Sequence, residues 1–285
     1  MPLDPKLIAE TLVKFKGNKT AAAKALGVDR SFFYPKLKRG TTSLVLADIH
    51  FPFHSPTVLE AAIAFAHQQH PTHIHLLGDV CDFYSISRFS KDPLRKENLM
   101  DDLEGAEMYI ARLRREFPRA VILYSEGNHE NRLKRYLWAK APELASVPAL
   151  SVPRLLHLKK HRVSWYSQAE PYKMGPLLFV HGDRVRKHSA MTAMAHFEKY
   201  GCSLLVGHCH RAGHYGVRRG GETWGAWEVP CLCTLEPEYD LEPNWINGWV
   251  WITHGDDGRY EVETIQAIKG KYNFRGKTVT YGENA

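Results

Sequence analysis

The sequence predicts a layered α/β domain that follows a small, all-helical N-terminal segment. Two observations predict this division. The first forty residues contain only short runs with helical spacing, whereas strand-like apolar runs alternate with helical runs from residue 41 to about residue 210. The last seventy residues then have the turn spacing of β-hairpins. We therefore expect two units, residues 1–40 and residues 41–285, which meet at Gly40.

The composition is that of a globular protein with a moderate excess of positive charge. The 285 residues carry a formal net charge of +7 and a sequence pI of about 9.1, which favours polyanionic partners such as DNA or RNA.

No apolar run approaches the ~20 residues of a membrane-spanning helix, and the N-terminus lacks the features of a secretory signal. The five cysteines include no CxxC pair, which fits a reducing compartment. We expect a cytoplasmic protein; the oligomeric state is not predicted.

The N-terminal segment has the spacing of three short helices. The first run is "PKLIAETLVKF", the second, "KTAAAKAL", ends at Gly27, and Asp29 is a suitable N-cap for a third, basic run. Two short helices joined by a glycine turn are typical of the helix-turn-helix motif, and residues 18–39 resemble the DNA-binding segment of the Fis family. Pro35 departs from the pattern, because proline inside a helix removes a backbone hydrogen bond. A DNA-contacting segment and a helical cap or dimerisation element are the two alternatives.

Each element expected after residue 41 has a local sequence reason. A helix is expected to begin at Ser55 and Pro56, because serine is a good N-cap and proline is favoured at the first helical position. Glycines at 220 and 221 predict the turn of a hairpin. The remaining strand-like runs are 43–47, 73–77, 120–124, 177–180 and 203–206, and the remaining helical runs are 97–117, 132–141 and 189–200.

Each of these five strand-like runs leads into aspartate, asparagine or histidine residues. The residues are Asp48 and His50 after the first run, Asp79 and Asp82 after the second, Asn128 and His129 after the third, His181 and Asp183 after the fourth, and His208 and His210 after the fifth. Because ligands bind at the carboxyl ends of strands in open α/β sheets, we expect these side chains to converge.

The residue types in these clusters predict a metal centre. Asp48 and His50 are two residues apart, as are His208 and His210, so both side chains of each pair face the same way in an extended chain. Carboxylate, imidazole and carboxamide ligands together suit borderline divalent ions such as Mn, Fe, Zn or Ni. Seven such residues are too many for one tetrahedral ion, but they suffice for two ions that share a carboxylate.

The series "DIH", "GDVCD", "GNHE", "HGD" and "GHCH" resembles the five-motif pattern of the calcineurin-like metallophosphoesterases over residues 44–210. The resemblance implies a four-layer α/β/β/α sandwich with two metal ions between its sheets, and it places the C-terminal tail in the second sheet. It also assigns the ligands: Asp48, His50 and His210 hold one ion, Asn128, His181 and His208 hold the other, and Asp79 bridges both.

The same resemblance makes His129 the catalytic histidine and Asp82 the residue that orients it. It implies hydrolysis of phosphoric esters by direct in-line attack of a metal-bridging hydroxide, with Mn the preferred ion. Phe83 and Glu126 stand where the family's Ser/Thr protein phosphatases have arginine, which argues against protein phosphatase activity. Asp82 also departs from the family's nuclease branch, in which histidine is usual at this position.

The combination of a helix-turn-helix-like segment with these motifs is similar to phage and prophage members of the family, and a phage-encoded protein would lie in the host cytoplasm. We therefore expect a phosphodiesterase, and specifically a nuclease that acts on DNA or RNA. Arg132, His54 and Arg135 lie near the motifs and are candidates to contact substrate. A phosphomonoesterase that acts on nucleotides or nucleic-acid ends is the alternative, and a DNA-binding regulator with a vestigial metal site is a third hypothesis.

Overall fold

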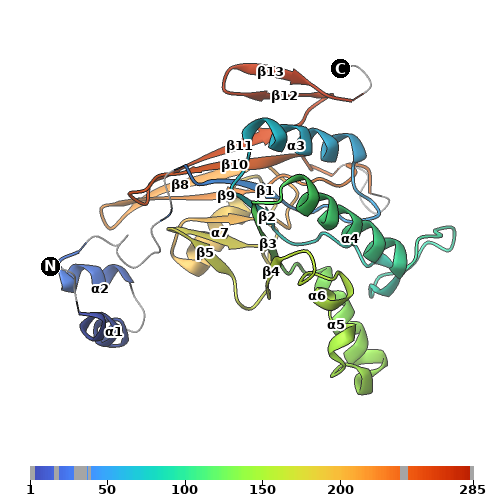
Figure 1. Ribbon diagram of the computed structural model, residues 1–285, viewed down its shortest axis with the longest axis horizontal. Helices are drawn as coiled ribbons and strands as arrows, with labels where there is room; N and C mark the ends of the chain where they lie inside the picture. The colour runs from blue at the N-terminus through green and yellow to red at the C-terminus, as the bar shows by residue number, and fades with distance from the viewer. Residues whose placement is uncertain (1–3, 16–18, 29–36, 38–39, 238–242, 283–285) are drawn as a thin grey trace.

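The computed structural model describes residues 4–15, 19–28, 37, 40–237 and 243–282. In the main body, two β-sheets pack face to face and helices cover their outer sides (Figure 1). The functional motifs lie where strands of the two sheets end.

The first sheet has six strands in the order β11-β10-β1-β2-β3-β4. Strands β1 to β4 run parallel, and β10 and β11 extend the sheet as antiparallel strands. Apolar runs rather than alternating patterns form the parallel strands, because both faces of this sheet are covered. The strand bounds are Thr42–Leu46 (β1), His73–Leu76 (β2), Val121–Ser125 (β3), Val163–Tyr166 (β4), Gly248–His254 (β10) and Tyr260–Gln266 (β11).

Helices α3 (Pro56–Gln69) and α4 (Leu99–Glu116) cover the outer face of the first sheet. α3 begins with proline in its first turn, as predicted, although the Ser55 side chain makes no capping hydrogen bond. α4 begins with a capping box in which the Asn98 side chain accepts a hydrogen bond from the backbone of the first turn. Apolar side chains of both helices form one core cluster with the sheet.

The second sheet has five strands in the order β5-β6-β7-β9-β8. Strands β6, β7 and β9 run parallel, and the edge strands β5 and β8 are antiparallel to their neighbours. Helix α7 (Met191–Tyr200) packs on its outer face through a separate apolar cluster. The strand bounds are Tyr172–Met174 (β5), Leu177–Val180 (β6), Leu204–Val206 (β7), Gly213–Arg219 (β8) and Glu222–Glu228 (β9).

Strand β1 shows how one strand serves two cores. Leu44 and Leu46 pack with the helices of the outer layer, whereas Val45 packs between the sheets with Phe179 and Leu205 of the second sheet. Successive side chains of a strand point to opposite faces, so alternate residues divide between the two cores. The layers therefore run α/β/β/α, and the predicted fold class is confirmed.

The prediction that the tail completes the second sheet is wrong for most of the tail. Only β8 and β9 join that sheet, as a hairpin that turns at the two predicted glycines. β10 pairs with β1 instead, and β12 (Lys271–Phe274) and β13 (Lys277–Thr280) form a separate two-stranded sheet. The physical reason lies in β10, where Trp249 and Trp251 face the helices while Val250 packs between the sheets. A strand that is apolar on both faces needs cover on both.

Helix α5 (Glu130–Lys140) begins directly after the third motif and leads away from the sheets. The irregular connection between β2 and α4 contains the short element η2 (Tyr84–Ile86). Three further short elements follow α5, namely η3 (Pro142–Leu144), η4 (Pro148–Leu150) and α6 (Val152–Leu155).

In the N-terminal segment, α1 (Pro5–Lys14) and α2 (Lys19–Leu26) occupy the first two predicted helical runs. Asp4 caps α1, as its side chain accepts a hydrogen bond of 2.9 Å from the backbone of the first turn. The third predicted run, which contains Asp29 and Pro35, falls outside the described residues. The boundary at residue 40 stays a prediction. Among the described helices, none is both long and apolar enough to span a membrane.

Candidate metal centre

The five predicted motif loops meet where strands of the two sheets end. Asp48, Asp79 and Asn128 follow β1, β2 and β3 of the first sheet, whereas His181 and His208 follow β6 and β7 of the second. The two sets are in direct contact. The backbone N–H of His208 lies 3.0 Å from both carboxylate oxygens of Asp48, to which it donates. The packing of sheet on sheet therefore brings the motifs together.

Asp48, His50 and His210 form the first group of potential ligands. The side chains are buried, and one ligand atom of each lies within 4.8 Å of the others. His210 Nε2 is 3.3 Å from Asp48 Oδ1 and 3.2 Å from His50 Nε2. Two imidazole nitrogens and one carboxylate oxygen thus face a common point, and this donor set fits a borderline divalent ion.

Asp79, His181 and His208 form a second group with the same 4.8 Å limit. His181 Nε2 lies 3.1 Å from Asp79 Oδ2 and 3.0 Å from Asn128 Oδ1, so the predicted carboxamide ligand belongs to this group. Asp79 Oδ2 is also 3.9 Å from His50 Nε2 of the first group. Asp79 therefore faces both groups, as a bridging ligand must.

Five of the seven candidate ligands have left-handed backbone conformations. Their φ angles lie between 51° and 67°, at Asp48, His50, Asp79, His208 and His210. This conformation costs a non-glycine residue on the order of 1–3 kcal/mol, and such strain concentrates at functional sites. The backbone is also packed closely here, because a Cβ added to Gly127 would lie 2.1 Å from Asp79 Oδ1.

The electrostatics of the second group favour bound positive charge. Burial raises the pKa of Asp79, but His129 and His181 outweigh it and hold that pKa well below its usual value. Burial lowers the pKa of His208 to about 4, and the charge of His181 acts in the same direction. Burial also lowers the pKa of His181, yet the Asp79 carboxylate raises it to about 10. A carboxylate that holds a proton on a buried imidazole this strongly is suited to hold a divalent ion.

His129, Asp82 and Arg132 form a hydrogen-bonded group beside the ligands. Arg132 Nη2 donates to His129 Nε2 at 2.8 Å, and because a guanidinium only donates, the proton of this imidazole is on Nδ1. Nδ1 then donates to the Asp82 carbonyl oxygen at 2.9 Å. His129 Nε2 is 3.7 Å from Asp79 Oδ2. The ring therefore lies against the candidate centre, with its orientation fixed from both sides.

Glu130 has a structural role. Its buried carboxylate accepts hydrogen bonds of 2.7 to 3.1 Å from the backbone N–H groups of Asp79, Val80, Cys81 and Gly127 and from the Tyr124 hydroxyl. These bonds tie the second motif loop to the third, and so position Asp79 relative to Asn128.

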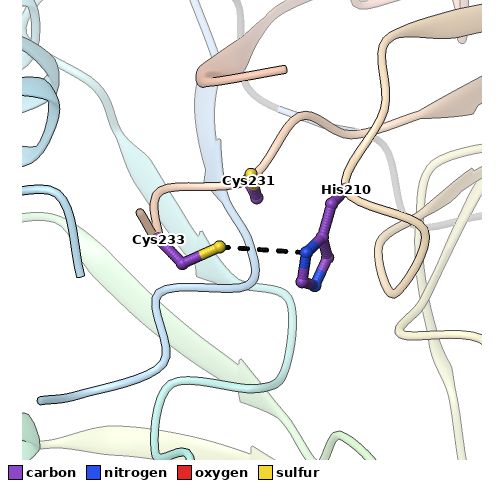
Figure 2. Close-up of side chains that lie close together, drawn as sticks. All are labelled: His210, Cys231 and Cys233. Carbon is purple, nitrogen blue, oxygen red and sulfur yellow. Dashed lines mark hydrogen bonds between the residues drawn. The ribbon is translucent and has the colours of Figure 1, made fainter. Parts of the chain in front are cut away.

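Cys231 and Cys233 lie beside His210 (Figure 2). Cys233 contacts Nδ1 of the ring, whereas Asp48 lies near Nε2. Cys233 Sγ is 3.8 Å from His210 Nδ1, and the two thiols with His210 form a third buried group that could hold a metal ion. The sequence predicts core packing for both cysteines, and both are buried. It gives no signal of the contact with His210, because 23 residues separate the partners in the chain.

A cavity of about 910 Å³ opens beside Asn128, His181 and His208 and continues along α5. The charged residues of its lining are predominantly basic. The cationic residues are Arg88, Arg132, Lys134, Arg135, Lys140 and Lys199, and the acidic residues are Glu126 and Asp183. The sequence gives no signal for Arg88 and Lys199, because only the fold brings the segments that carry them to the cavity.

The three predicted substrate contacts differ in position. Arg132 and Arg135 line the cavity, whereas His54 does not. The His54 ring instead packs on Phe51, and its Nδ1 lies 3.2 Å from the Pro52 carbonyl oxygen. His54 belongs to the turn before α3, which explains its separation from α5.

Comparisons with known proteins found similarity both in the N-terminal segment and over most of the chain. A family model described as "Bacterial regulatory protein, Fis family" matches residues 3–40. The chain is 28% identical to the Gene 54 protein of Mycobacterium phage D29 over 249 residues, which cover 82% of this chain and 96% of that protein. Among solved structures, a single mutant of Vps29 from Entamoeba histolytica is 13% identical with a TM-score of 0.46, covering 85% of this chain and 100% of that one. The nuclease MPE of Pseudomonas putida is 11% identical with a TM-score of 0.36, covering 83% and 85%.

Proposed function

We propose that this chain, which combines an α/β/β/α fold with the five motifs of the calcineurin-like metallophosphoesterases, is a metal-dependent phosphoric ester hydrolase that acts on phosphodiesters of nucleic acid. The main support for this proposal is the position of Asp79, because its carboxylate faces both candidate ligand groups. The first ion would be held by Asp48, His50 and His210, the second by Asn128, His181 and His208, and both by Asp79.

Two divalent ions in such a centre lower the pKa of water and neutralise charge on a reacting phosphate. Neighbouring side chains that are not ligands have to orient the ligand side chains. Asp82 contributes here, because its Oδ2 lies 3.0 Å from His50 Nδ1 and so directs Nε2 of that ring toward the first group. Glu130 contributes through the backbone of Asp79, to which it is hydrogen-bonded.

His129 is the proposed general acid. Its Nε2 accepts a hydrogen bond from Arg132 and lies beside Asp79 without belonging to either ligand group in our assignment. A substrate phosphate that binds the Arg132 guanidinium through two oxygens competes for this contact. Nε2 is then free to carry a proton and to pass it to the leaving oxygen.

The charge of the cavity supports a polyanionic substrate. Four of its cations, Arg88, Lys134, Arg135 and Lys140, form no ion pair with another described residue. Three of them lie on α5, where Lys134 and Lys140 are six residues apart, which is roughly 9 Å along the helix axis. Four such cations around one cavity exceed what one phosphate monoester needs, and they favour a polymer with repeated phosphates.

The first experiment compares two chromogenic esters of one phenol. We expect the Mn²⁺-loaded protein to hydrolyse bis(p-nitrophenyl) phosphate with a higher kcat/KM than p-nitrophenyl phosphate, and Fe, Zn and Ni would be tested in parallel. The variant His129→Ala, purified in the same way, controls for contaminating phosphatases. A preference for the mono-ester would replace the phosphodiesterase proposal with the phosphomonoesterase alternative.

A further inference from the structure

Two of the largely exposed aromatic side chains line the same cavity. Among the described residues, Phe89, Tyr136 and Trp138 are the aromatic residues that are largely exposed, at 63%, 41% and 59%. Phe89 and Tyr136 also line the basic cavity that contains Asn128 and His181. Large aromatic rings left in water beside a proposed active site indicate a binding surface for a planar, apolar group.

Both rings are carried by backbone that is held in place. The Lys91 ammonium donates hydrogen bonds to the Phe89 carbonyl oxygen at 2.8 Å and to the Ser87 hydroxyl at 2.6 Å, which fixes the loop on which Phe89 lies. Tyr136 belongs to helix α5. The two rings are therefore presented at defined positions even though their faces are open to solvent.

Cations alternate with these rings along the cavity. Arg132, Tyr136 and Lys140 follow one another at intervals of four residues, so they form one stripe along α5, and all three line the cavity. On the opposite loop, the Arg88 guanidinium lies 5.5 Å from the centre of the Phe89 ring. Proteins that bind single strands combine these two elements, because cations follow the phosphates while aromatic rings stack on successive bases.

We propose that the cavity binds single-stranded nucleic acid, with Phe89 and Tyr136 stacking on unpaired bases and Arg88 and Lys140 contacting the flanking phosphates. The inference rests on the proposed function and specifies its substrate. A duplex presents only base edges in its grooves, since the faces of its bases are already stacked. Rings that need an open base face therefore select a single strand over a duplex.

The test uses the full-length, Mn²⁺-loaded protein and three substrates of equal length: a single-stranded oligothymidylate, an abasic strand with the same phosphates, and the oligothymidylate paired with oligoadenylate. We expect wild-type protein to cleave the base-bearing single strand fastest. Loss of one stacked base lowers affinity roughly 5- to 150-fold. The double variant Phe89→Ala with Tyr136→Ala should therefore lose most of the preference for bases over abasic sites.

Two further variants keep the test interpretable. Replacing both rings with leucine preserves apolar bulk without an aromatic face, and this variant should lose the preference as well. Ile268→Ala removes a side chain that is 52% exposed and does not line the cavity, and it should behave as wild type. An unchanged preference in both double variants, or wild-type cleavage of the duplex at the rate of the single strand, would overturn the inference. Absence of any Mn²⁺-dependent turnover of bis(p-nitrophenyl) phosphate would instead contradict the proposed function itself.

Discussion

The backbone N–H of Asp79 donates a hydrogen bond of 2.9 Å to Glu130, a residue 51 positions later in the chain. The same carboxylate accepts four further hydrogen bonds, which together join the loop after β2 to the loop after β3. The position of the proposed bridging ligand thus depends on a buried glutamate that touches neither candidate ion site directly.

Glu130→Gln should destabilise the protein and loosen the proposed centre. A carboxamide places an NH₂ group where the carboxylate accepted backbone N–H groups, so at least one buried donor loses its acceptor. Hydrogen bonds to charged groups contribute about 1.5–3 kcal/mol each, and we expect the free energy of unfolding in urea to fall by about that amount. Glu198→Gln, on the exposed surface of α7, is the matched control and should change it little. Equal stabilities for the two variants would contradict the role given to Glu130.

Cys233→Ala should weaken metal binding at the first group. The thiol lies 3.8 Å from His210 Nδ1, and the partner of the second ring nitrogen fixes the orientation of a ligating histidine. Losses of such partners cost roughly 10–100-fold in metal affinity. Titration of Mn²⁺ into the metal-free protein measures the effect, and Cys202→Ala, a buried cysteine outside this group, is the control. An affinity equal to that of wild type would show that the thiol does not orient His210.

The buried pair His75 and His254 should make the protein less stable in acid. Ser43 Oγ lies 3.0 Å from Nε2 of both rings, between the two sheets. Burial lowers the pKa of His75 well below its ordinary value, and burial together with the charge of His73 lowers the pKa of His254 to about 4.

The direction in which stability changes with pH follows from the number of protons that the folded and unfolded chains bind. The unfolded chain, with a histidine pKa near 6.5, binds more protons than the folded chain between about pH 6.5 and pH 4, so stability falls as the pH falls through this window. For His254 alone, the loss between pH 7.5 and pH 5 should be about 2 kcal/mol. Urea unfolding with excess chelator, for wild type and His254→Gln, isolates this contribution, because the candidate ligands titrate equally in both. A pH dependence that is identical in the two proteins would contradict it.

Removal of residues 1–40 should leave turnover of bis(p-nitrophenyl) phosphate nearly unchanged but weaken binding to duplex DNA. All proposed ligands follow this segment, whereas the basic stretch "PKLKR" lies within it. Each lost phosphate contact should reduce the slope of log K against log salt by roughly 0.9. Equal slopes for the full-length and shortened proteins would leave the helical-cap or dimerisation hypothesis for these residues.

The residue pattern was sufficient to predict a layered α/β domain and to place the ligand candidates at strand ends, because both depend on local patterns. The order of the four layers and the division of the ligands into two groups came from the resemblance to the calcineurin-like metallophosphoesterases. Apolar runs fix strands such as β1, and the residues immediately after each run, such as Asp48, have no freedom to lie far from the strand end. Contacts between distant segments were not predictable. Cys233 reaches His210 only because the chain after β9 passes beside the fifth motif, and Phe89 reaches the cavity from an irregular loop with no periodicity to read. Most of the tail was assigned to the wrong sheet. The apolar residues of β10 indicate that both faces of this strand are buried, but they do not indicate which sheet it joins.

The most direct test of the two-metal account is the metal content of Asp79→Asn and His129→Ala, measured by elemental analysis beside their rates. Wild-type protein should hold two equivalents of Mn²⁺. Asp79→Asn removes the charge that faces both groups, so it should lose metal and activity together. His129→Ala should keep both equivalents and lose roughly 10²–10⁴-fold in rate, the usual range for a general acid. Its defect should be smaller on the nitrophenyl ester than on an oligonucleotide, because nitrophenolate leaves without a proton. Loss of one equivalent from His129→Ala, or two equivalents retained by Asp79→Asn, would contradict the assignment of ligands on which the account rests.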